Sequence, residues 1–169
     1  MGYVNDTAMS QFIPAINFAF SLGTWTPTLA SNVVSNVRTA GAASCNVFIP
    51  ILIPSNLVAL KGSRLKSIDV WYSIATADLT DFATVEIEAI TLPANATLPT
   101  ATTLASTQDA LHNTAALRKA QQNAKMTITV TTPVWIADLL QYVVNLVLSC
   151  AATSVVTFYG ALIHYDARE

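Results

Sequence analysis

The sequence predicts an all-β domain, a two-sheet antiparallel sandwich of about eight strands with a jelly-roll-like arrangement. Three observations support this fold class. Apolar and polar residues alternate with period two in several segments, which is the pattern of strands with one buried face. Proline, glycine, asparagine and serine separate these segments, as expected for turns. Outside residues 108–124, no segment longer than about ten residues has a helical period.

The clearest strand covers residues 68–74, and similar alternation occurs at 85–88 and 126–131. In the first segment, Ile68, Val70, Tyr72 and Ile74 take one face, and Asp69, Trp71 and Ser73 take the other. Segments rich in β-branched and aromatic residues predict further strands at 24–29, 33–39, 45–53, 143–150 and 154–165. Residues 108–124 suit either one short helix or a long loop, and residues 136–142 suit a short turn.

Long connections between antiparallel strands favour a jelly roll over an immunoglobulin-like sandwich. Cys45, Trp71 and Cys150 imitate the immunoglobulin spacing only loosely. Each cysteine lies within a predicted strand, so we favour two buried thiols over a disulfide between them.

Residues 1–22 differ from the rest of the chain and predict an extended N-terminal arm in front of a sandwich domain at 23–169. An arm of this kind needs a partner surface to become ordered. Its apolar side chains are the predicted interface contacts: Phe12, Ile13, Phe18 and Phe20.

The composition predicts a subunit of an assembly. Hydrophobic residues make up 53% of the 169 residues and charged residues only 11%, against about 25% in an ordinary soluble domain. So few charges cannot solvate a free surface well, so we expect neighbouring subunits to cover part of it. The sequence lacks the roughly 18 consecutive apolar residues of a membrane helix, and its net charge of −2 with scattered basic residues argues against nucleic-acid binding.

Chemistry-bearing motifs are few, and we expect neither enzymatic activity nor a cofactor or metal. The two histidines have no second histidine or cysteine at ligand spacing. Glu86 and Glu88 share one strand face at a separation of about 7 Å, which leaves a glycoside hydrolase as a minor alternative. Alternating charges are, however, what a half-exposed strand normally carries.

The aromatic residues suggest a different alternative, a carbohydrate- or receptor-binding module of a phage tail fibre. Trp71 and Trp135 are the candidate binding aromatics, because exposed indole rings provide stacking platforms. Large aromatics on strands more often belong to a core or an interface.

Three segments resemble small β-rich virion structural proteins of tailed phages, of the decoration or fibre-associated kind. They are residues 23–27 (GTWTP), 62–70 (GSRLKSIDV) and 151–160 (AATSVVTFYG). The resemblance implies a homotrimeric subunit that packs on the major capsid protein or at the base of a fibre. It also implies assembly in the host cytoplasm into the virion. The resulting hypothesis is a capsid decoration or cement protein that stabilises a shell.

Overall fold

The computed structural model describes residues 5–55, 62–93, 95 and 97–168. These residues form two antiparallel sheets that are not closed into a barrel, in a sandwich-like arrangement. Sheet A contains, in spatial order, β3 (Trp25–Ala30), β4 (Val33–Arg38), β12 (Val155–Arg168), β6 (Gly62–Ala75), β10 (Gln122–Trp135) and β9 (Ser106–Gln108), and β1 (Asp6–Pro14) also pairs with β12. Sheet B contains β2 (Ala19–Phe20), β5 (Ala43–Ile51), β11 (Leu140–Cys150), β7 (Asp81–Thr91) and β8 (Thr100–Leu104).

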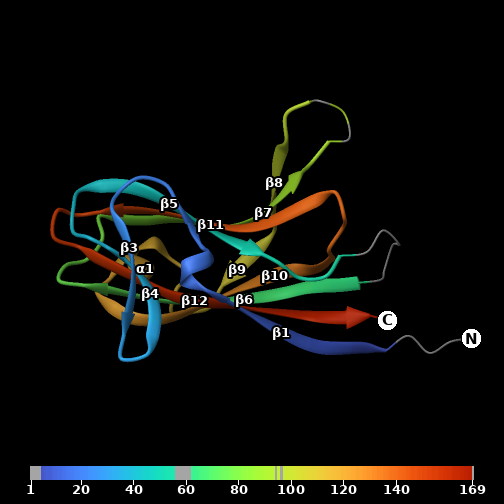
Figure 1. Cartoon of the computed structure of the whole chain (residues 1–169), viewed down its shortest axis with the longest axis horizontal. Helices are drawn as coiled ribbons and strands as arrows, with labels where there is room; N and C mark the ends of the chain where they lie inside the picture. The colour runs from blue at the N-terminus through green and yellow to red at the C-terminus, as the bar shows by residue number, and fades with distance from the viewer. Residues whose placement is uncertain (1–4, 56–61, 94, 96, 169) are drawn as a thin grey trace, which may run out of the picture.

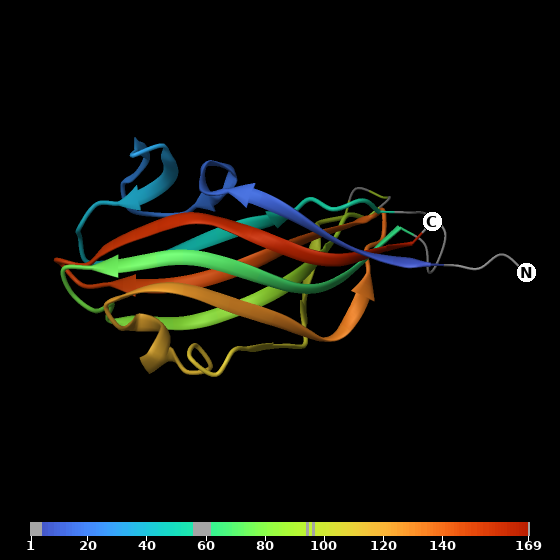
Figure 2. The same cartoon turned by 90° about the horizontal axis from the view of Figure 1, so that it is seen from below.

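The chain moves back and forth between the two sheets. From β4 onward it changes sheet at each connection, except between β7 and β8 and between β9 and β10, which are neighbours within a sheet. In Figure 1 the strands of sheet B lie above those of sheet A, and Figure 2 shows β12, β6 and β10 side by side. Strands far apart in sequence therefore meet on one face.

The core lies between the sheets and follows the predicted alternation. Ile68, Val70, Tyr72 and Ile74 are at most 2% exposed, as the period-two pattern predicts. Met126, Ile128 and Val130 on β10 face the same core, and their threonine neighbours point outward. The prediction of a two-layer antiparallel sandwich is confirmed at this level.

The N-terminal segment is paired to its own chain. β1 forms a continuous antiparallel ladder with β12, from Asp6 opposite Arg168 to Pro14 opposite Gly160. The physical reason is an open edge: β4 pairs with β12 over only three residues, so β1 completes the rest. This differs from the expected arm that needs a partner surface to become ordered.

The four predicted arm contacts have different environments. Ile13 and Phe18 are buried in the core, and Phe20 is half-buried and stacks on Trp25 with 4.1 Å between ring centroids. Phe12 remains 56% exposed. Of the four, Phe12 offers the most surface to a neighbouring molecule.

Residues 108–124 form only one short helix, α1 (Ala115–Lys119), before β10 begins. Thr114 caps it by accepting a hydrogen bond from the amide of Leu117 at 3.3 Å. Arg118 is buried and donates to the carbonyls of Phe82 and His112, which holds the helix on the sandwich. A 3-10 turn, η1 (Ala15–Asn17), follows β1, and no described helix has the length and apolar character to cross a membrane.

Cys45 and Cys150 are free and buried, as we favoured from the sequence. They lie on the neighbouring strands β5 and β11, with Cys45 opposite Leu148 and Cys150 opposite Ala43. Both thiols therefore belong to the apolar layer between the sheets.

Candidate functional site

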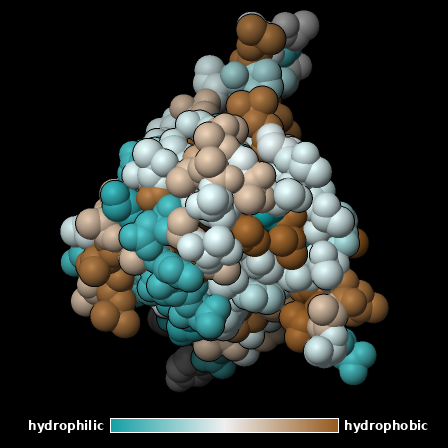
Figure 3. All heavy atoms as spheres, turned by 90° about the vertical axis from the view of Figure 1, so that its left-hand side faces the viewer, coloured by the Kyte–Doolittle hydropathy of each residue, from teal (hydrophilic) through white to brown (hydrophobic). Residues whose placement is uncertain are grey.

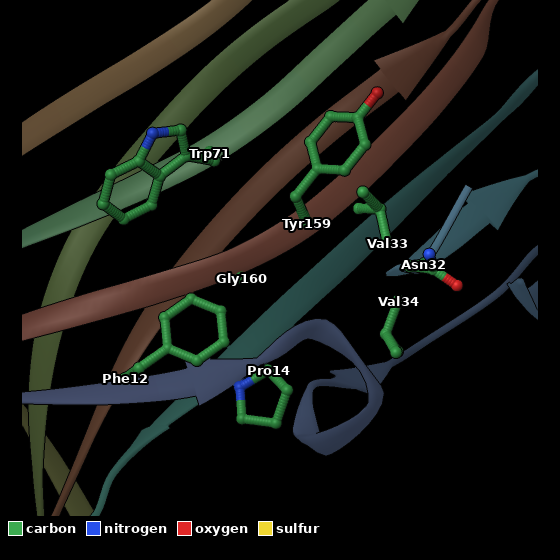
Figure 4. Close-up of a pocket in the computed structure, with 8 residues that line it drawn as sticks. All are labelled: Phe12, Pro14, Asn32, Val33, Val34, Trp71, Tyr159 and Gly160. Atoms are coloured by element: carbon green, nitrogen blue, oxygen red, sulfur yellow. The ribbon is translucent and has the colours of Figure 1, made fainter. Parts of the chain in front are cut away.

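The outer face of sheet A carries a groove lined by aromatic and aliphatic side chains. Its members, which we call the aromatic groove, are Phe12, Val33, Val34, Trp71 and Tyr159, with Pro14, Asn32 and Gly160 at its edges. The groove encloses a cavity of about 390 Å³, within the range of about 300–1,000 Å³ of small-ligand sites. Figure 4 shows that its side chains come from β1, the β3–β4 hairpin, β6 and β12.

The tyrosine of this groove lies at a β-bulge in β12. Phe158 pairs with Tyr72 and Gly160 pairs with Trp71, so Tyr159 is an extra residue without a partner on β6. Phe158 is fully buried and Tyr159 is exposed beside Trp71, and after the bulge the buried side chains are Ala161 and Ile163, so the bulge shifts the alternation of β12 by one residue. The Tyr159 hydroxyl lies 3.2 Å from Oγ of Ser73, which fixes the outer end of its ring.

Gly160 makes room for the third ring. A Cβ atom at this position would lie 2.5 Å from Cζ of Phe12 and 2.9 Å from the carbonyl oxygen of Ile13. Its φ of +150° also lies in the region that favours glycine. The absence of a side chain therefore allows Phe12 to lie close over β12, and the three rings surround Gly160 in Figure 4.

The β3–β4 hairpin forms one wall of the groove. Ser31 and Asn32 both have positive φ, 51° and 64°, as a two-residue type I′ turn requires. Because β4 pairs with β12 only at residues 156–158, the hairpin stands to one side of the sheet (Figure 2). Val33 and Val34 are exposed and line the groove on this side.

A polar cluster lies next to the groove on the same face. Asp69, 7% exposed, accepts hydrogen bonds from Oγ1 of Thr127 at 2.6 Å and Nζ of Lys125 at 3.1 Å. Nε2 of His164 lies 3.2 Å from the same carboxylate. Burial alone would raise the pKa of Asp69, but the hydrogen bonds from Thr127, Lys125 and His164 outweigh it and lower the pKa below its usual value.

A second cavity shares lining residues with both the aromatic groove and the polar cluster. Trp71 and Tyr159 line this cavity together with Tyr72, Asn123, Ala124 and Lys125. Lys125 also lines a third cavity, which contains Asp69, Thr127 and His164. Aromatic and hydrogen-bonding side chains thus follow one another along the outer face of sheet A.

The two candidate tryptophans have different surroundings. Trp71 lies on β6 at the centre of the outer face and lines two cavities. Trp135, at the end of β10, lies beside two guanidinium groups, with Cζ of Arg168 at 4.6 Å and Cζ of Arg64 at 5.5 Å from its ring. The two guanidinium groups cover the indole ring of Trp135, whereas the indole ring of Trp71 lines the groove.

The predicted pair of carboxylates lies on the other sheet. Glu86 and Glu88 are half-buried on β7, and Oε1 of Glu88 accepts a hydrogen bond from Asn145 at 3.0 Å. None of the cavities described above includes them. Within the described part of the chain, no group of three or more His, Cys, Asp or Glu side chains is placed to hold a metal ion.

Comparison with known proteins gave no assignment: no family model and no curated protein matches the chain. The groove therefore has to be interpreted from its own residues. The sequence singled out Trp71 and Phe12 but not Tyr159, the hairpin valines or the Asp69 cluster. The glycine after Tyr159, inside an otherwise alternating strand, is the one local signal that could have indicated a bulge there.

Proposed function

We propose that the protein is a structural virion subunit, a homotrimer that decorates or cements a phage shell by packing against copies of itself and the major capsid protein. Its function is then mechanical and needs no catalytic group. A capsid role is supported by the resemblance of three sequence segments to virion proteins and by the arrangement of the strands.

The strand order supports a jelly-roll assignment. If β4, β5, β6, β7, β8, β10, β11 and β12 are numbered one to eight, one sheet has the order 1-8-3-6 and the other 2-7-4-5. With the additional strands β1, β2, β3 and β9 left out, this is the order expected for the two four-stranded sheets of a jelly roll, an architecture used by viral capsid and lectin domains. The same architecture hosts many functions, so the function depends on the surface of this particular chain.

A cluster of exposed leucines carries the proposal. Leu52, Leu92 and Leu139, which we call the leucine patch, are 57%, 44% and 59% exposed. They flank the ends of three neighbouring strands, β5, β7 and β11, and the amide of Leu92 donates to the carbonyl of Leu139 at 2.9 Å. Exposed large apolar residues gathered at one end of a sheet favour an interaction surface more strongly than the same residues scattered singly.

The rest of the surface is consistent with burial by neighbours. Ile16, Leu22 and Leu29 are each more than half exposed. Figure 3 shows one end of the sandwich, where most atoms have intermediate hydropathy, with separate apolar patches and a narrow hydrophilic band. Fully burying a side chain such as leucine contributes roughly 1.5–3 kcal/mol, so several such contacts per subunit can hold an oligomer together.

Charge substitution in the leucine patch tests the proposal. We expect the Leu52→Glu/Leu139→Glu double variant to have a lower mass than the wild-type oligomer in size-exclusion chromatography with light scattering. The reason is that burying two carboxylates at an interface is costly. Leu111→Glu is the matched control, because Leu111 is 74% exposed but lies in the connection between β9 and α1.

The control variant should keep the wild-type mass. An unchanged mass for the double variant would remove the leucine patch from the proposed interface. An equal loss of mass in both variants would show a general effect of added charge.

A further inference from the structure

We propose that the aromatic groove binds a neutral oligosaccharide, with one sugar ring stacked on Trp71 and its neighbours positioned by Tyr159 and Phe12. This site goes beyond the proposed assembly role, since a shell subunit does not need it. It also does not depend on that role, because all of its residues belong to one chain.

The rings are arranged for stacking. Phe12, Trp71 and Tyr159 surround Gly160, and Figure 4 shows each ring with its broad face toward the viewer. The C–H groups on one side of a pyranose ring form an apolar surface that packs against aromatic faces of this kind. Gly160 and the bulge at Tyr159 lie between the three rings, so the local backbone allows the rings to lie around one point of β12.

Hydrogen-bonding groups lie beside the rings, as sugar hydroxyls require. The Tyr159 hydroxyl, with Ser73 at 3.2 Å, stands at the edge of the stacking surface. Asn123 and Lys125 line the adjoining cavity, which shares Trp71 and Tyr159 with the groove. Apolar walls with a few convergent polar groups are the usual composition of a small-ligand site.

The charges favour a neutral ligand over an acidic one. In the part of the chain that the structure describes, Lys125 is the one charged side chain lining the aromatic groove or the adjoining cavity. Its ammonium group is already paired with the carboxylate of Asp69 at 3.1 Å. No net charge is therefore left in the groove to attract a sulfate or carboxylate of an acidic sugar.

The size of the groove favours a sugar chain over a protein segment. The main cavity is about 390 Å³ and the adjoining one about 450 Å³, and both lie within the small-ligand range. Both cavities have Trp71 and Tyr159 in their linings, so they lie side by side on the outer face of sheet A, where a chain of more than one sugar ring would run. A neighbouring copy of the chain is the competing occupant, and the mass of the groove variants in solution distinguishes it from a sugar.

The test is calorimetric titration of the full chain with soluble neutral oligosaccharides built from glucose, galactose, mannose or N-acetylhexosamine units. We expect at least one to bind, and Trp71→Ala to weaken that binding by about tenfold or more through loss of the stacking surface. Tyr159→Ala should weaken it as well. Trp135→Ala is the matched control, since its ring lies beside Arg64 and Arg168 outside the groove, and it should bind like the wild type.

The mass of each variant is measured in parallel by light scattering. If no oligosaccharide of the panel binds, or if Trp71→Ala and Tyr159→Ala bind as well as the wild type, the proposed site is overturned. It is also overturned if Trp71→Ala lowers the mass of the oligomer, because the groove is then filled by another copy. Sugar binding by a chain that proves monomeric would support this site and contradict the assembly role.

Discussion

The aromatic groove depends on single residues, and Gly160 is the position where a side chain is least tolerated. Its φ of +150° and the contact of a would-be Cβ with the Ile13 carbonyl mean that any side chain strains the bulge. Phe12 would also have to move, which would open the aromatic groove. The site is thus sensitive to one added methyl group.

We expect Gly160→Ala to lower the free energy of unfolding by about 1–3 kcal/mol, from backbone strain and the clash with Ile13. The measurement is urea denaturation followed by tryptophan fluorescence. Gly41→Ala is the matched control, because no atom lies within 4 Å of the added Cβ. It should change the free energy of unfolding by no more than about 0.5 kcal/mol. Equal effects at the two glycines would contradict the role given to the bulge.

At the scale of elements, β1 is the segment for which the prediction from the sequence differs most from the structure. Its residues alternate about the plane of sheet A, so Ile13 faces the core at 2% exposure while Phe12 faces the groove. Ile13 therefore contributes to the stability of the fold, whereas its neighbour Phe12 contributes to the surface of the groove.

We expect Ile13→Ala to lower the free energy of unfolding by about 2–5 kcal/mol, as for other buried large-to-small substitutions. Phe12→Ala should cost no more than about 1 kcal/mol, because the side chain is largely exposed. Denaturation curves of the two variants, measured side by side, check this. Similar small losses for both would mean that β1 is a detachable arm after all.

The sequence predicted those elements in which core-facing apolar residues alternate with more polar ones. Residues 68–74 and 126–131 alternate clearly because one face of β6 and β10 lies in the core. β8 and β9 were missed because they are short edge strands in which no side chain is fully buried, so they show little alternation. β1 was missed because its first five residues are exposed on both faces. Its pairing depends on the open edge of a strand about 150 residues away, which no local pattern reveals.

The groove could be predicted only in part. Trp71 could be identified because it lies on the polar face of a strongly alternating strand. Its neighbours Tyr159, Val33 and Phe12 come from three other elements, and only the pairing of β1, β4 and β6 with β12 brings them together. The Asp69 cluster likewise joins residues of β6, β10 and β12.

At the scale of the whole molecule, the two proposals use different surfaces. The leucine patch flanks strand ends of sheet B, whereas the aromatic groove lies on the outer face of sheet A. A subunit can therefore pack through the first and keep the second open. Charged residues make up only 11% of the chain, so few charged side chains have to be desolvated when either surface is covered.

The mass of the purified wild-type chain in solution, by light scattering during size-exclusion chromatography, tests the central claim most directly. An assembly subunit should elute as a stable oligomer. A homotrimer would have a mass of about 54 kDa, three times the 18.0 kDa of one chain. A single species near 18.0 kDa at all concentrations would contradict the account, because the leucine patch and the low charge would then be tolerated without any partner.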